Sequence, residues 1–250
     1  MKLAFCLYGL VGSTTNKYGF DKLLSPEIAY KFYKKNVFNQ FRGHVDIFLH
    51  SQSFNHKKQL INLYKPKLYK IEKQKKFKQS LNHPHLKKLK LLKFKNLFEK
   101  LYGSTKSLDK YNYLKKKAVA SYSRWYSFQQ AIKLKKKKKF EEKKKFKYHL
   151  VFITRYDLII KSKYLIHNFD PLKLTVPFHN TVPAPQDNYK NKPTRNNKTH
   201  YKGISDFWFA ASSKNMDKFA NLYNRIEEYP LTTHFSSYNH SKYLNLELDY

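Results

Sequence analysis

The sequence predicts an α/β fold in which a mostly parallel central sheet is flanked by helices. Short apolar runs of strand length alternate along the chain with segments whose apolar residues recur at helical spacing. This alternation is typical of β-α-β units, in which right-handed crossovers place helices over a parallel sheet. The length of 250 residues and the 41% hydrophobic content are enough for one sizeable core, so we expect a single domain.

The first strand and the first helix are predicted from their residue patterns and their ends. Residues 2–10 form an apolar run, and turn-forming residues follow it in the stretch VGSTTNKYG. Ser25 is a suitable N-cap, Pro26 suits the first helical position, and Gly43 lies where a helix-terminating glycine is expected. We therefore expect a helix that begins at Pro26 and ends just before Gly43.

Two further strands complete a β-α-β-α-β beginning. Residues 44–51, HVDIFLHS, are rich in β-forming residues and end in polar ones. A short helical piece at residues 56–64 and a strand at residues 67–74 follow. Residues 75–117 are lysine-rich, with scattered Leu and Phe and no clear caps, which indicates a partly helical insertion within the domain.

One long helix is predicted in the middle of the chain, over about residues 110–134. Its apolar residues recur at helical spacing, and we expect Trp125 and Tyr126 in the core. The lysine-rich stretch that follows, KLKKKKKFEEKKKFK, indicates a solvated extension of this helix or a tail that contacts anions.

The last part of the chain is predicted to add three strands and one helix. The strands correspond to residues 149–154, 172–178 and 204–212. Ser213 is the expected cap of a helix at residues 214–228. Residues 179–203 form a long polar loop with three prolines, and loops of this length are usually functional or disordered.

The formal net charge of +34 indicates an anionic partner, because such a field attracts nucleic acid, anionic membranes and phosphate-bearing substrates. Only five of the 51 basic residues are arginine, which leaves 46 lysines. An A/T-rich genome also imposes heavy use of Lys, Asn, Tyr, Phe and Ile, so the lysines alone indicate little about function. The rare arginines are more informative, because their planar fork recognises phosphate or carboxylate through two hydrogen bonds.

Several classes of protein are excluded by the sequence. The single cysteine, Cys6, rules out an intrachain disulfide and a multi-cysteine zinc site. No apolar run approaches the roughly 18 residues of a membrane helix, and the N-terminal apolar stretch lacks a signal-peptide cleavage site. Motifs of P-loop NTPases, dinucleotide dehydrogenases, nucleophile-elbow hydrolases and zincin proteases do not occur. We expect a cytoplasmic protein, with peripheral contact with a membrane surface as an option.

Charged residues interrupt the strand-like run at residues 148–160, YHLVFITRYDLII. In open α/β sheets ligands bind outside the carboxyl ends of the strands, so Arg155 and Asp157 are expected at the edge that forms the site. Two earlier strands also end in polar groups, at Tyr8 and at His50. The three strand ends are expected to converge. The alternative for Arg155 and Asp157 is an ordinary ion pair at the end of a strand.

Asp157 has the chemistry of a ligand for a hard divalent cation. Mg²⁺ and Mn²⁺ are commonly held by one or two carboxylates, and substrate phosphates complete the coordination. Arg155 beside it is suited to the same phosphates.

Six segments of the chain resemble, in their order, a family of poorly characterised bacterial and viral glycosyltransferase-like proteins, similar to the GT-A fold of nucleotide-sugar transferases. The segments are KLAFCLYGL, VDIFLHS, YKPKLYKIEKQ, SRWYSFQQAIKLK, YHLVFITRYDLII and ISDFWFAASSKNMDKFANLY. The resemblance covers about residues 2–225 without the insertion. In GT-A enzymes the last aspartate of a D-x-D motif binds the metal that bridges the donor diphosphate, and the matching residue is Asp157. Arg155 replaces the first aspartate, and an arginine is suited to take over part of the role of the metal.

The resemblance also implies where the nucleotide lies. It places the nucleotide against the loop after the first strand, near Tyr8, Gly9 and Leu10, where a glycine permits close backbone approach.

Three further residues are candidates for the site. Arg124 is a candidate for contact with the donor phosphates, because arginine is so scarce in this chain. Asp206 is a candidate for contact with the acceptor or for the general base on its hydroxyl; the alternative is a polar residue that opens a strand. His50 is a candidate for a hydrogen bond to donor or acceptor; the alternative is a satisfied polar group at a strand end.

The resemblance therefore implies a metal-assisted glycosyltransferase, with Mn²⁺ or Mg²⁺, that moves a sugar from a nucleotide-diphosphate sugar to a saccharide or glycan acceptor. The alternative is a basic nucleic-acid-binding protein without catalytic activity, which would use the lysine-rich residues 134–147 and the insertion at 75–117. No basic-aromatic module signature occurs, so we expect no specific nucleic-acid partner. Contact of the lysine-rich segments with an anionic membrane is compatible with the enzyme.

Overall fold

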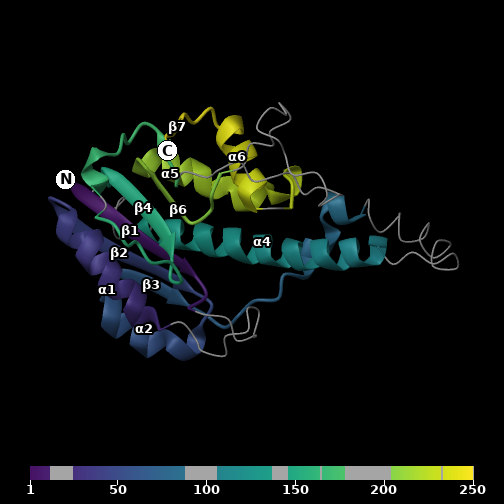
Figure 1. Cartoon of the computed structure of the whole chain (residues 1–250), viewed down its shortest axis with the longest axis horizontal. Helices are drawn as coiled ribbons and strands as arrows, with labels where there is room; N and C mark the ends of the chain where they lie inside the picture. The colour runs from purple at the N-terminus through teal and green to yellow at the C-terminus, as the bar shows by residue number, and fades with distance from the viewer. Residues whose placement is uncertain are drawn as a thin grey trace, which may run out of the picture.

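A mixed β-sheet forms the centre of the protein (Figure 1). The computed structural model describes residues 1–11, 25–87, 106–136, 146–163, 165–177, 204–231 and 233–249. Within these residues the sheet has seven strands in the order β3-β2-β1-β4-β6-β5-β7. The strands are β1 (Lys2–Gly9), β2 (His44–Ser51), β3 (Leu68–Ile71), β4 (Leu150–Arg155), β5 (Leu174–Thr175), β6 (Trp208–Ala211) and β7 (Leu248–Asp249).

The directions and the order of the strands define where a ligand can bind. β1 to β4 run parallel, β6 runs antiparallel to its neighbours β4 and β5, and β7 runs parallel to β5. The predicted α/β class with a mostly parallel sheet and flanking helices is thereby confirmed. The chain adds β2 and β3 on one side of β1 but β4 on the other. The carboxyl ends of β1 and β4 therefore form a topological switch point, where open α/β sheets bind ligands.

Helices cover both faces of the sheet (Figure 1). The α-helices are α1 (Pro26–Asn36), α2 (Lys57–Tyr64), α4 (Lys106–Lys136), α5 (Ser213–Phe219) and α6 (Thr233–Tyr243). The 3-10 helices are η1 (Phe38–Gln40), η2 (Phe54–His56), η3 (Lys78–Asn82), η4 (Ile166–Asn168) and η5 (Ala220–Glu228). Leu3 and Phe5 of β1 pack in the cluster shared with α1 and α2, whereas Ala4 and Cys6 pack in the cluster shared with α4 and α5. β1 is thus buried on both faces, as a central parallel strand should be.

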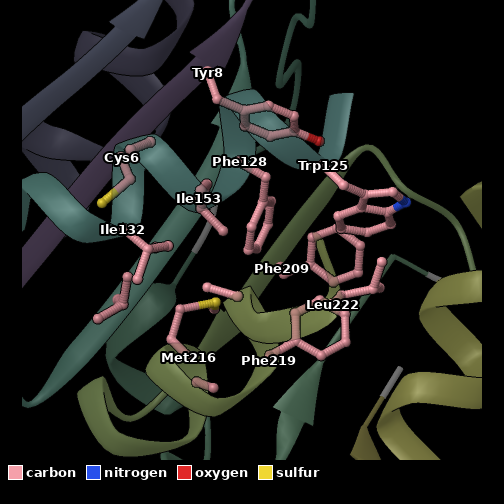
Figure 2. Close-up of a cluster of buried hydrophobic side chains, with 14 of the residues drawn as sticks. Cys6, Tyr8, Trp125, Phe128, Ile132, Ile153, Phe209, Met216, Phe219 and Leu222 are labelled. Atoms are coloured by element: carbon pink, nitrogen blue, oxygen red, sulfur yellow. The ribbon is translucent and has the colours of Figure 1, made fainter. Parts of the chain in front are cut away.

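Aromatic side chains fill the core between the sheet and α4. Figure 2 shows Trp125, Phe128, Phe209 and Phe219 packed together, with ring centroids 5.4 Å apart for Trp125 and Phe128 and 5.0 Å apart for Phe209 and Phe219. The first pair meets edge to face and the second at a tilt, and such aromatic contacts add to the free energy gained by burial. Trp125 is 1% exposed and Tyr126 is 8% exposed, which confirms the predicted core positions of both.

The first helix begins as predicted and ends earlier. The Ser25 hydroxyl accepts a hydrogen bond from the Glu27 amide, and α1 starts at Pro26. The helix ends at Asn36, so Gly43 is not its terminating glycine. A Cβ at Gly43 would lie 2.5 Å from the Met1 carbonyl oxygen, so a glycine is needed here for close approach of two backbone segments.

The second half of the chain differs from the prediction mainly in the lengths of its elements. The strands predicted at 172–178 and 204–212 are reduced to the two residues of β5 and the four residues of β6. The predicted helix at 214–228 is capped by Ser212 instead of Ser213 and continues after Phe219 as the 3-10 helix η5. α6 and β7 then follow in a region for which the sequence suggested no element.

Parts of the predicted loop and insertion lie outside the described residues. Those parts are residues 179–203 of the loop and residues 88–105 of the insertion. Of the remaining insertion, Phe77 and Leu86 are buried, and residues 106–117 form the start of α4. None of the described helices is long and apolar enough to cross a membrane.

Lys135 contradicts the prediction that the lysine-rich stretch is solvated throughout. Its side chain is 0% exposed, and its ammonium group donates hydrogen bonds to the Ser213 hydroxyl at 2.7 Å and to the Asp217 carboxylate at 2.6 Å. A buried ammonium needs such partners, because desolvation of an unpaired charge is costly. Lys135 therefore joins the end of α4 to α5.

Removal of the carboxylate that compensates Lys135 should destabilise the fold. We expect Asp217→Ala to lower the free energy of unfolding by about 3 kcal/mol, because it leaves a buried charge without its counter-ion. Urea denaturation measures this difference. As the matched control, Glu228→Ala removes the exposed partner of Arg225 and should have a much smaller effect. Equal effects of the two substitutions would show that the buried pair is not needed for stability.

Candidate functional site

Residues from distant parts of the sequence meet at the ends of β1 and β4. Tyr8 pairs in register with Arg155, so the two strands end side by side. The Tyr8 hydroxyl donates a hydrogen bond to the carbonyl oxygen of Asp206 at 3.2 Å. Its ring packs edge-on against Phe128 of α4, with centroids 5.3 Å apart. Three of the predicted site residues, Tyr8, Arg155 and Asp206, are therefore brought together by the sheet.

Two arginine–aspartate pairs lie near Tyr8. Arg155 donates from Nε to Asp157 Oδ1 at 2.7 Å and from Nη2 to Asp157 Oδ2. Arg124 of α4 pairs through Nη1 with Asp206 Oδ2. Burial raises the pKa of the Tyr8 hydroxyl, and the positive charges of Arg124 and Arg155 act against this rise. Both rare arginines thus lie within electrostatic reach of one buried hydroxyl.

Hydrogen bonds to both the amide and the carbonyl oxygen of Gly9 hold this residue in its conformation. Its φ of +105° favours glycine, and apart from Gly9 and its two chain neighbours no described residue has an atom within 4 Å of the position that a Cβ would take. The Gly9 amide donates to the Ser127 hydroxyl at 2.8 Å, and its carbonyl oxygen accepts from the Ser51 hydroxyl at 3.0 Å. Leu10 follows and is half-buried. The backbone after β1 is therefore held in place, and within the described residues Gly9 is not crowded by other segments.

His50 supports this backbone from inside the protein. Its Nδ1 lies 2.6 Å from the Ser127 hydroxyl oxygen, and its Nε2 lies 3.2 Å from Glu72 Oε1. A carboxylate only accepts, so Nε2 carries the proton and Nδ1 accepts from Ser127. Tyr126 also donates to Glu72 Oε1, at 2.7 Å. His50 is fully buried, so it acts on the site through Ser127 and Gly9.

Asp206 is a buried carboxylate with a charged partner, whereas a general base needs an accessible oxygen. Its side chain is 2% exposed and its Oδ2 pairs with Arg124. His234 Nδ1 lies 3.8 Å from its Oδ1 and 3.0 Å from the Ile204 carbonyl oxygen. One of its two carboxylate oxygens is therefore engaged by Arg124. The role of Asp206 as general base stays a prediction.

Asp157 can hold a divalent cation only when Arg155 moves away from it. Both of its oxygens accept from Arg155, and the described residues contain no cluster of three or more His, Cys, Asp or Glu side chains that could hold a metal. Mg²⁺ is often bound by one carboxylate when substrate phosphates supply other ligands. Asp157 can therefore reach a metal only after Arg155 moves away, and phosphates would then complete the coordination.

The sequence contains no signal for three of the residues at this site. Ser127, Glu72 and His234 are not among the predicted site residues, and their residue types alone indicate no function. Their contacts connect positions 22 to 118 residues apart, such as Glu72 with His50 and Ser127 with Gly9. Only the tertiary structure identifies them.

No protein-family model matches this chain, and no curated protein matches it. Function is therefore argued from the chemistry of the site.

The buried His50 should make stability depend on pH. Burial lowers its pKa to about 4, against a hydrogen bond to Glu72 that acts in the opposite direction. Between about pH 6.5 and pH 4 the unfolded chain binds more protons at this position, so stability falls as pH falls through this window. Protonation of His50 in the unfolded chain should lower the free energy of unfolding by about 3 kcal/mol between these two pH values.

Urea denaturation of the parent and of His50→Gln between pH 4.5 and pH 7.5 measures this contribution. The variant should show a flatter dependence of the free energy of unfolding on pH. His240, whose pKa burial also lowers to about 4, remains in the variant and keeps its own contribution. An unchanged slope would mean that His50 takes up its proton in the folded protein.

Proposed function

We propose that this protein is a glycosyltransferase that moves a sugar from a nucleotide-diphosphate sugar to a saccharide or glycan acceptor. One observation carries the proposal: two of only five arginines lie beside Tyr8 at the topological switch point, Arg155 in register with it and Arg124 paired with Asp206, whose carbonyl oxygen accepts from the Tyr8 hydroxyl. Guanidinium groups bind phosphate oxygens through two parallel hydrogen bonds. Two of them at a ligand-binding edge favour a diphosphate ligand.

The backbone at Gly9 supports the same ligand. Apart from Gly9 and its two chain neighbours, no described residue would contact a Cβ there, and the Gly9 backbone is held rigidly by Ser127 and Ser51. A nucleotide can approach the backbone of a glycine more closely than the backbone of any other residue, because glycine has no Cβ. A rigid contact surface also reduces the entropy lost on binding. Tyr8, Gly9 and Leu10 are therefore the proposed contacts of the nucleotide.

Charge stabilisation is the chemistry that these residues offer. In sugar transfer the bond between the anomeric carbon and the diphosphate oxygen breaks, and a new bond forms to an acceptor hydroxyl oxygen. Negative charge then develops on the leaving diphosphate, and positioned cations lower the barrier for this step. Arg155 and Arg124 are the proposed side chains, and Asp157 would hold Mn²⁺ or Mg²⁺, which supplies further stabilisation of the leaving group.

The acceptor hydroxyl must lose its proton during the reaction. Asp206 is the proposed general base, and its carboxylate stays paired with Arg124 while it accepts the proton. The net charge of +34 would draw the anionic donor toward the protein and would also favour peripheral contact with an anionic membrane. The alternative of nucleic-acid binding depends largely on residues 88–105 and 137–145, which lie outside the described residues.

Nucleotide binding tests the proposal directly. The chain should bind at least one of UDP, GDP and CMP in isothermal titration calorimetry, more tightly with Mn²⁺ than without it. No heat of binding for any of the three, with or without Mn²⁺, would contradict the proposal. Sub-micromolar binding of nucleic acid in a filter assay at physiological salt would favour the alternative function instead.

Substitution of Asp157 separates a catalytic role from a structural one. Asp157→Asn should lower donor turnover by about 100-fold or more, because the metal that stabilises the leaving diphosphate is lost. Its pair with Arg155 is partly exposed, so the free energy of unfolding should change by about 1 kcal/mol or less.

A matched control is available in the second arginine–carboxylate fork. Arg225 donates from Nε and Nη2 to Glu228 on the exposed side of η5, so Glu228→Gln weakens a similar pair away from the site. This control should keep full turnover. A folded Asp157→Asn variant with the turnover of the parent would refute the assignment of Asp157, and an unfolded one would show that the pair holds the strand.

A further inference from the structure

The fork of Arg155 covers the carboxylate that the proposed function requires for metal binding. Nε lies 2.7 Å from Asp157 Oδ1, and Nη2 bonds Oδ2, so each oxygen accepts from the same guanidinium. A divalent cation at Asp157 would lie within a few ångströms of this positive charge, and the two cations would repel each other. As long as Arg155 stays in place, Asp157 is a poor metal ligand.

The backbone around Arg155 is fixed, so only the side chain can open this pair. The Tyr33 hydroxyl donates to the Arg155 carbonyl oxygen at 2.6 Å. The next residue, Tyr156, is 2% exposed and lies in the core cluster with Tyr33 and Tyr64. Arg155 itself is the last residue of β4. A rotation of the arginine side chain is therefore the motion that frees Asp157.

Of the two arginine–aspartate pairs at the site, the Arg155 pair is the easier to open. The Asp157 side chain is 28% exposed and can be solvated when Arg155 leaves. The Asp206 side chain is 2% exposed, so loss of Arg124 would leave a buried carboxylate without compensation. Exchange of partners is thus expected at Arg155 and not at Arg124.

We propose that Arg155 closes Asp157 to metal ions until a diphosphate draws the guanidinium away. This inference rests on the proposed function and assigns Arg155 as the residue that couples the two ligands. A diphosphate offers the fork phosphate oxygens in place of the carboxylate oxygens. Asp157 is then exposed to a cation that the same phosphates help to bind. The protein therefore takes up metal together with the diphosphate and holds little metal alone.

Titration of the full chain with MnCl₂ alone tests this role, because no nucleotide is needed. Bound Mn²⁺ can be followed by the electron paramagnetic resonance signal of the free ion. We expect Arg155→Gln to bind one Mn²⁺ about tenfold or more tightly than the parent, because a neighbouring positive charge has been removed. The double variant Arg155→Gln/Asp157→Asn should lose this gain, and the control Arg225→Gln should bind like the parent.

Each of the other outcomes overturns the inference. Mn²⁺ binding by Arg155→Gln that is as weak as in the parent would show that Arg155 does not obstruct Asp157. A gain that survives in the double variant would place the metal elsewhere. Tight Mn²⁺ binding by the parent alone would show that Asp157 is already accessible.

A second variant keeps the test valid if Arg155→Gln does not fold. Arg155→Met removes the charge and keeps an unbranched side chain, so it should show a similar gain in Mn²⁺ affinity. An affinity equal to that of the parent, in a folded Arg155→Met protein, would also overturn the inference. Failure of the proposed function is distinguishable, because it would appear as absent nucleotide binding by the parent, whereas these titrations contain metal only.

Discussion

The Ser127 hydroxyl joins the three elements on which the candidate site depends. It accepts from the Gly9 amide at the end of β1 and donates to Nδ1 of His50 at the end of β2, while Ser127 itself belongs to α4. One hydroxyl can serve both bonds because it has one proton and two lone pairs. The Glu72 carboxylate fixes the tautomer of His50 and thus the direction of the whole chain of hydrogen bonds. The conformation of Gly9 follows from this arrangement.

Compensated charges connect the helices to the sheet around this network. Lys135 and Asp217 join α4 to α5, and Arg124 and Asp206 join α4 to the segment before β6. In each pair one partner is almost fully buried, so separation would expose an uncompensated charge to the protein interior. Such pairs hold elements in place but cannot change partners easily. Arg155 and Asp157 are more exposed, so this pair can exchange partners at the sheet edge while the buried pairs keep the helices in place.

Sequence patterns were most informative where a local rule decides the structure. Ser25 and Pro26 mark the start of α1 because capping depends on residues within one turn. The pattern was less informative for Gly43, whose role depends on contact with Met1, and for Lys135, whose partners lie about 80 residues away. The 3-10 continuation after α5 also has no clear signal in the sequence. These features arise from contacts between segments, which a local pattern does not describe.

The sequence by itself determined the α/β class, the strand ends that carry polar residues and the scarcity of arginine, because each depends on composition or on spacing along the chain. Only the tertiary structure decided that Arg124 pairs with Asp206, that Arg155 covers both oxygens of Asp157, and that His50 faces Ser127 instead of a ligand. The physical reason is that the direction of a side chain at a strand end depends on the elements packed around it. Those elements come from segments more than 70 residues apart, such as those of His50 and Ser127.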